Sequence, residues 1–329
     1  MKNFITYVRD YFRNVSLPVF IITFIFLAGL VIMNYTVGIE RRILDFGAWY
    51  VVVGGFYIFY VLVVVFAWGL QYIYGGKEEE KFFFHPSLVK LLLLAPLFFA
   101  LKMVHWDISR VLPRSLVYPW TRYWVIVLQL PAKLLLLCCL LLACSKSGLL
   151  QGDSAAASMD SAEAPMGSAR ASIGLTAGGF DARPYFLLLL LLVPVIVLAS
   201  TQPDFLHYYP KVKNLAFLDG YTSPVWPWKL GYELSYGLDF LTIELFFRGL
   251  LIVALVRYAG PRAILPMAAF YCTIHFGKPL GECVSSFFGG LVLGVLAYRT
   301  RSILGGLIVH LGLAWMMEIG GWLGQGWLG

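Results

Sequence analysis

The sequence predicts an all-α polytopic membrane protein with about eight or nine transmembrane helices, and three observations carry this prediction. The chain has 329 residues, of which 60% are hydrophobic and only 13% are charged, whereas a soluble domain usually carries about 25% charged residues. Its mean hydropathy is +0.78. Apolar runs of about 20 residues, the length that crosses a bilayer as a helix, recur along the chain.

Each expected span is an apolar run between polar or charged segments. The expected spans are 17–35, 48–74, 88–103, 124–144, 184–201, 229–257, 263–275, 284–298 and 303–323. The first is too long for the apolar region of a cleaved signal peptide, so it is expected to span the membrane. The runs 88–103 and 263–275 are short, which indicates tilted or half-inserted helices.

The basic residues predict both the orientation and the partners. Lysine and arginine gather in short loops that an N-terminus on the cytoplasmic side would place in the cytoplasm. This bias accounts for the formal net charge of +7 without nucleic acid. The expected partners are membrane lipids and a membrane peptide or protein. The five cysteines form no CxxC pair and are interpreted as reduced, buried and small.

The chain is expected to have three parts. Residues 1–144 form an N-terminal transmembrane bundle with no recognisable chemistry. Residues 145–183 are dominated by Ser, Ala and Gly and predict a flexible low-complexity loop, because such a composition cannot bury a core. Residues 184–329 form a second membrane domain, which contains the polar residues discussed next.

Four ionisable residues lie in otherwise apolar sequence near the C-terminus, namely Glu244, Arg248, His275 and His310. Each costs several kcal/mol at membrane depth unless it is paired or lines a wet cavity. Structural alternatives are a salt bridge between Glu244 and Arg248, which share a helix face, and hydrogen bonds from single histidines. Together, a carboxylate and two imidazoles offer a general base and oxyanion partners, or a two-histidine, one-carboxylate metal site. The sequence requires no cofactor and leaves a divalent metal on Glu244, His275 and His310 open.

These residues carry a resemblance to a known family over about residues 229–318. The runs IELFFRG, HFGKPLGE and AYRTRSILGGLIVH, with Tyr271 four residues before His275, resemble the CAAX prenyl protease and bacteriocin-processing family of intramembrane endopeptidases. The resemblance implies a CAAX-protease-like core of C-terminal helices. The family pattern is Glu-Glu-x-x-x-Arg, Phe-x-x-x-His and His-x-x-x-Asn. In it, the first Glu and first His activate water, while the second His and the Asn stabilise the oxyanion.

Two positions depart from this pattern. Ile243 stands where the resemblance places the water-activating glutamate, and Ala314 stands where it places the asparagine. Losing a general base costs about 10²- to 10⁴-fold in rate. Asp239 lies one helical turn before Ile243 and Glu318 one turn after Ala314, so either carboxylate is a candidate replacement.

Glu244 itself is a further candidate for the missing base. It could serve if its helix is rotated or locally unwound, in which case it must leave Arg248. Glu282 is interpreted as a loop group that pairs with Lys278.

The resemblance implies an intramembrane endopeptidase that cleaves a membrane-embedded or lipid-anchored peptide with water activated by Glu and His. The candidate catalytic residues are Glu244, His275, His310, Arg248 and Asp239. The alternative is a catalytically silent member that acts as a membrane scaffold or partner-binding subunit, which Ile243 and Ala314 favour. A transporter has less support, because the sequence shows no internal repeat.

Overall fold

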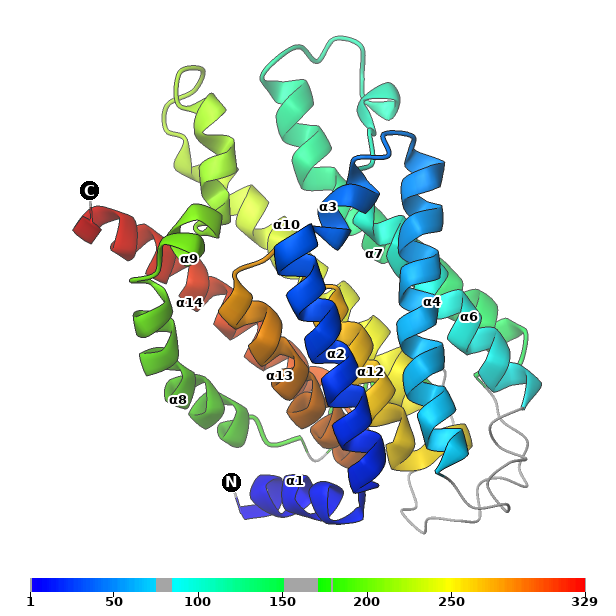
Figure 1. Cartoon of the computed structure of the whole chain (residues 1–329). Helices are drawn as coiled ribbons and strands as arrows, with labels where there is room; N and C mark the ends of the chain where they lie inside the picture. Colours follow the sequence, from blue (N-terminus) through cyan, green and yellow to red (C-terminus); the bar gives the residue numbers. More distant parts are fainter. Residues whose placement is uncertain (1, 75–84, 151–170, 179, 329) are drawn as a thin grey trace. The chain divides into compact units, whose positions relative to one another are not determined.

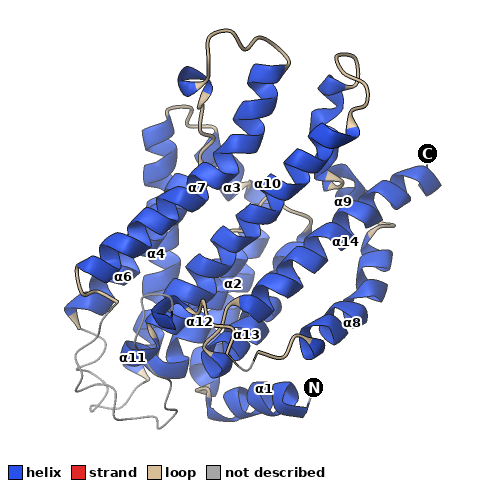
Figure 2. Cartoon of the chain, turned by 180° about the vertical axis from the view of Figure 1, so that it is seen from behind, coloured by secondary structure: helices blue, strands red, loops and turns tan. Residues whose placement is uncertain are grey.

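The computed structural model describes the chain except for residues 1, 75–84, 151–170, 179 and 329. The described residues contain helices and loops and no strand, which confirms the all-α class (Figure 2). The longer helices are α1 (Lys2–Asn14), α2 (Leu17–Val37), α4 (Trp49–Ile73), α6 (Pro86–Met103), α7 (Trp120–Lys146), α8 (Arg183–Ala199), α10 (Trp226–Glu244), α12 (Ile264–Thr273), α13 (Leu280–Thr300) and α14 (Leu304–Leu328). The shorter ones are α3 (Ile39–Leu44), η2 (Ser109–Val111), η4 (Ala171–Ile173), α9 (Pro203–Tyr208), η5 (Lys211–Leu218), η6 (Leu245–Ala254), α11 (Val256–Ala259) and η7 (Gly260–Ala263).

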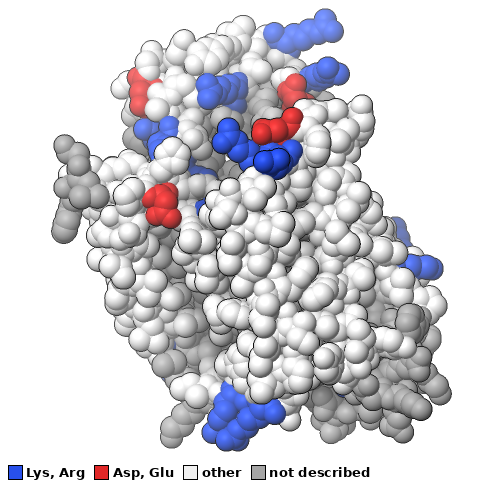
Figure 3. Space-filling model, viewed as in Figure 1, with Lys and Arg blue, Asp and Glu red and all other residues white. Residues whose placement is uncertain are grey.

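Six of the described helices are long and apolar enough to cross a membrane. They are α2, α4, α6, α7, α13 and the part of α14 that ends at Gly326. A seventh span results if α8 and the segment Pro203–Leu218, which are bent by 96° at their junction, count as one. Apolar side chains such as Ile25 (64% exposed) and Leu62 (60%) point outward from these helices, as lipid-facing side chains do. On the face shown in Figure 3, most described atoms belong to uncharged residues. The orientation that places the N-terminus on the cytoplasmic side of the membrane stays a prediction.

The chain forms two compact units that interleave along the sequence. The first unit comprises residues 1–104, 141–181 and 245–306, and the second comprises 105–140, 182–244 and 307–329. Each is described by itself below. The predicted division at residues 144 and 183 stays a prediction, and most of the expected loop 145–183 lies outside the described residues.

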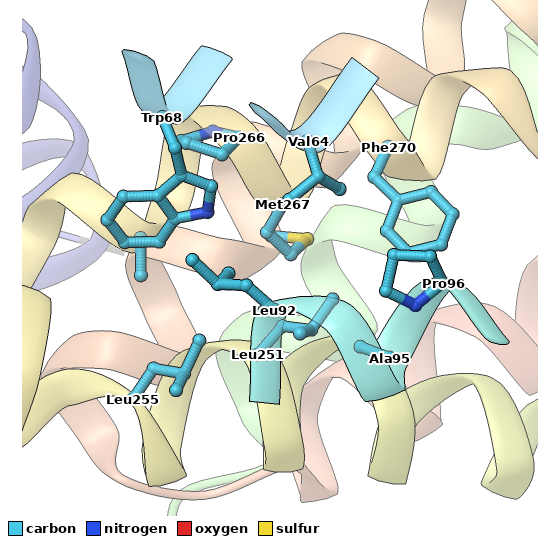
Figure 4. A pocket seen from close by; sticks show the side chains of 11 residues that line it. Val64, Trp68, Leu92, Ala95, Pro96, Leu251, Leu255, Pro266, Met267 and Phe270 are labelled. Atoms are coloured by element: carbon cyan, nitrogen blue, oxygen red, sulfur yellow. The ribbon is translucent and has the colours of Figure 1, made fainter. Parts of the chain in front are cut away.

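The core of the first unit surrounds α12, and every residue of that helix is buried. Its sequence, ILPMAAFYCT, has no charged side chain, which suits a short helix enclosed by α4, α13 and η6 (Figure 1). Phe270 of α12 packs its ring against Phe99, Phe246 and Phe247 at centroid distances of 5.4–5.9 Å. A small pocket beside this cluster is lined by apolar side chains alone, including Trp68, Leu251 and Met267 (Figure 4). It therefore offers no group for acid–base chemistry.

The second unit is built from α7, α8, α9, η5, α10 and most of α14. Tyr123 of α7 donates a hydrogen bond to the carbonyl of Trp228 in α10 at 3.0 Å, and Ser235 donates to the carbonyl of Val127 at 2.5 Å. Tyr123 and Val127 also share an apolar cluster with Leu215 of η5. These contacts fix α10, which ends at Glu244, against α7.

Gly321 lets α14 approach the backbone that joins α9 to η5. A methyl carbon on Gly321 would lie 2.7 Å from the nitrogen of Pro210 and from the carbonyl carbon of Tyr209. Because backbone cannot move aside as a flexible side chain does, Gly321→Ala is expected to lower the unfolding free energy by about 1–3 kcal/mol. The matched control is Gly326→Ala on the same helix, where no atom lies within 4 Å. Unfolding curves that give equal stability for the two variants would contradict this packing.

Candidate functional site

Glu244 and His310 form a hydrogen-bonded pair in the second unit. Glu244 is the last residue of α10 and is fully buried, while His310 lies on α14 and is 8% exposed. The imidazole Nδ1 of His310 contacts the carboxylate Oε1 of Glu244 in a short hydrogen bond. A carboxylate accepts this bond from an Nδ1–H group, so the neutral ring keeps its lone pair on Nε2. This is the tautomer that a histidine general base needs.

Phe240, one helical turn before Glu244, supports the same ring. Its centroid lies 6.1 Å from that of His310, and the two ring planes differ by 28°. The imidazole is therefore fixed at its edge by a carboxylate and on its face by an aromatic side chain. Phe240 was not predicted from the sequence, where one phenylalanine among many apolar residues gives no signal.

The α-helix that carries Glu244 changes its winding directly after this residue. The π-helical segment η6 begins at Leu245, and all ten of its residues are buried. A π-helix places more residues in each turn than an α-helix, is rare, and occurs often at functional sites. It rotates the side chains that follow Glu244 relative to a continuous α-helix. Glu244 itself still belongs to the α-helix, so its role as a base through a local change in winding stays a prediction.

Arg248 lies within η6 in the first unit and is fully buried. Its guanidinium carbon lies 4.5 Å from the ring centroid of Tyr271 on α12, which is a cation–π geometry. Tyr271, which stands where the family pattern has phenylalanine, thus presents its ring to Arg248. The salt bridge between Glu244 and Arg248 stays a prediction.

His275 follows the end of α12 in the first unit and is 7% exposed. Its Nδ1 lies 2.8 Å from the backbone carbonyl of Tyr271. Because a carbonyl only accepts, Nδ1 carries the proton, and the neutral ring keeps its lone pair on Nε2. The edge of the Tyr271 ring meets the imidazole at a centroid distance of 4.6 Å. His275 and His310 therefore share one tautomer, although a backbone group orients one and a carboxylate the other.

The two candidate replacement carboxylates differ in their surroundings. Glu318 is buried, and its oxygens accept hydrogen bonds from the backbone N–H groups of Lys211 at 2.7 Å and Val212 at 3.1 Å. It therefore caps the first turn of η5, which is a structural role. Asp239 is half-buried on α10, and its role stays a prediction. Glu282 pairs with Lys278 at 2.7 Å, as the sequence predicts.

The structure brings Glu244 and His310 together in the second unit, and Arg248, Tyr271 and His275 together in the first. Within the described part of the chain, no three His, Cys, Asp or Glu side chains cluster as metal ligands do. In the second unit, the pair offers an imidazole base oriented by a buried carboxylate. In the first unit, a second imidazole and a guanidinium both lie against the ring of Tyr271.

Residues 234–316 match one family, described as type II CAAX prenyl endopeptidase Rce1-like. This stretch runs from the middle of α10 to the middle of α14 and includes Glu244, Arg248, His275 and His310. It confirms the resemblance predicted from the motifs. The chain matches no curated protein and no solved structure.

Proposed function

We propose that this chain is an intramembrane endopeptidase, because its residues 234–316 match the type II CAAX prenyl endopeptidase Rce1-like family. In this proposal the pair Glu244–His310 activates the water that hydrolyses the peptide bond. The single observation that carries it is the hydrogen bond between the buried carboxylate of Glu244 and Nδ1 of His310. This bond gives the chain an oriented base although the family's first glutamate is replaced by Ile243.

The proposed reaction follows from the tautomer of His310. Nε2 of His310 takes a proton from water as the water oxygen attacks the peptide carbonyl carbon. Glu244 stabilises the imidazolium that forms, and the imidazolium then gives its proton to the departing amine nitrogen. His275 and Arg248 belong to the matched stretch of the family, and we keep them as proposed catalytic residues on the strength of these motifs alone.

The substrate proposed is a membrane-embedded or lipid-anchored peptide. His310 lies on α14, in the part that is long and apolar enough to cross a membrane, and both members of the pair are buried. A buried site of this kind suits a peptide that already lies within the bilayer, because a soluble peptide would have to lose its hydration to reach it. Low solvent exposure also strengthens the interaction between Glu244 and the imidazolium.

A second candidate function is a catalytically silent membrane scaffold. The observation that favours it is that Ile243 and Ala314 stand at motif positions where the family pattern has a carboxylate and an amide. Both side chains are buried and neither can take a proton or donate a hydrogen bond. Under this alternative, Glu244 and His310 are retained because each satisfies the other inside the apolar core.

The test is cleavage of membrane peptides by the purified protein in lipid vesicles. The wild type is expected to yield a defined product, and His310→Ala is expected to form it about 10²- to 10⁴-fold more slowly, because the base is gone. The matched control is His207→Ala, which changes an exposed histidine of the same unit. A wild type that yields no product from any peptide offered would favour the scaffold. Equal rates for His310→Ala and wild type would exclude this histidine as the base.

A further inference from the structure

Residues near the start of the sequence contact the turn formed by residues 275–278. His275, Phe276, Gly277 and Lys278 form a turn in which the N–H of Lys278 donates to the carbonyl of His275 at 3.2 Å. Gly277 has φ +76°, a conformation that favours glycine. Tyr35, near the end of α2, donates from its hydroxyl to the carbonyl of Lys278 at 2.5 Å.

Glu40 places its carboxyl group directly against this turn. A methyl carbon on Gly277 would lie only 2.8 Å from the carboxyl carbon of Glu40, so this carboxyl fills the room that glycine leaves. The backbone fixes Glu40 there: Gly38 ends α2 at φ +77°, and the N–H of Glu40 donates to the Asn34 side chain at 2.9 Å. All these residues belong to the first unit.

Burial and a nearby lysine act in opposite directions on the pKa of Glu40. Burial raises the pKa of Glu40 to about 7, and the positive charge of Lys278 opposes this rise. Lys278 also pairs with Glu282 at 2.7 Å, so its charge is shared between two carboxylates. The other titratable and charged groups near Glu40 are Tyr35, Tyr60 and, on α3 itself, Arg41, Arg42 and Asp45.

We propose that Glu40 is a positioning residue for His275, which it serves by holding the turn from 275 to 278 and by supplying a negative charge beside it. This inference rests on the proposed peptidase function. The family pattern pairs the first histidine with a carboxylate that is here Ile243, a residue without charge. Glu40 brings a carboxylate to the His275 turn from a different helix. Below neutral pH this carboxyl is protonated and the charge is lost.

The rate of cleavage against pH tests this role. The wild-type rate is expected to rise as Glu40 ionises near pH 7. Glu40→Gln keeps the size of the side chain but never ionises. It is therefore expected to lose the part of this rise that Glu40 causes and to be up to about 100-fold slower at pH 8. Glu40→Asp keeps the charge and is expected to recover part of the rate. Glu282→Gln is the matched control at pH 8. It removes the other carboxylate beside Lys278 but leaves Glu40 ionised, so its rate at this pH is expected to be unchanged.

Thermal unfolding gives a second measurement that needs no substrate. A carboxyl whose pKa is raised in the folded state favours folding at low pH, and this contribution is lost as pH rises from about 4.5 to about 7. The wild type is therefore expected to lose melting temperature between pH 5 and pH 8, and Glu40→Gln is expected to lose less. At pH 8 the glutamine variant is expected to be the more stable protein.

The outcomes separate this inference from the proposed function. A wild type that cleaves and a Glu40→Gln variant with the same rate and pH profile would overturn the role of Glu40 and leave the peptidase standing. No product from the wild type would overturn both. A slow Glu40→Gln variant that the aspartate restores, beside an unchanged Glu282→Gln, would establish the positioning role.

Discussion

Replacing Glu244 by glutamine is expected to lower the rate of peptide cleavage about 10²- to 10⁴-fold while the protein stays folded. Glutamine keeps the shape of the side chain and an oxygen that accepts from Nδ1 of His310. It lacks the negative charge that stabilises the imidazolium when Nε2 takes a proton from water. The measurement is the initial rate of product formation in lipid vesicles, with circular dichroism to verify that the helices remain.

A double-mutant cycle shows whether the two side chains act as one unit. His310→Gln alone is expected to cleave as slowly as Glu244→Gln. The cleavage rate of the double variant is expected to be at most about tenfold lower than that of either single variant. This follows because removing one partner already removes the function of the pair. Losses that multiply in the double variant would mean that Glu244 and His310 act independently, which the hydrogen bond between them does not allow.

The second large effect concerns stability. Arg248→Ala is expected to lower the unfolding free energy by about 3 kcal/mol or more, because a fully buried long side chain is removed and leaves a cavity. The loss includes the cation–π contact with Tyr271 at 4.5 Å. Arg248→Lys keeps the charge but not the planar group that lies over the ring. Its unfolding free energy is therefore expected to lie between those of the alanine variant and the wild type.

Variants of Tyr271 provide the control for Arg248. Tyr271→Phe keeps the aromatic face and is expected to have nearly wild-type stability. Tyr271→Leu removes that face and is expected to lose roughly 1–2 kcal/mol. Reversible unfolding in detergent measures all four variants on one scale. If Arg248→Ala unfolds at the same denaturant concentration as the wild type, the buried guanidinium does not stabilise the first unit.

Features that depend on nearby residues could be predicted from the sequence. The all-α class follows from apolar composition and long apolar runs, and the described helices confirm it. The pair Lys278–Glu282 follows from four-residue spacing at the start of a helix, and the two side chains lie 2.7 Å apart. The family resemblance follows from motif order and is confirmed over residues 234–316.

Features that depend on distant residues could not be predicted in this way. The hydrogen bond between Glu244 and His310 joins residues 66 positions apart, and no spacing in the sequence indicates it. The π-helical winding of η6 has no sequence signal in IELFFRG, since its residues suit an α-helix equally well. Glu40 lies in a short polar segment between two apolar runs, where a solvated charge is the ordinary expectation. Only the folded chain brings it to Gly277.

The most direct test of the Glu244–His310 pair uses water labelled with ¹⁸O. Wild-type protein and Glu244→Gln are incubated in vesicles with a membrane peptide, and mass spectrometry follows the new carboxyl terminus of the product. We expect the wild type to place one ¹⁸O atom in this carboxyl group at each turnover, and Glu244→Gln to form almost no labelled product. Labelled product at the same rate from both proteins, or none from either, would contradict a water-activating pair at Glu244 and His310.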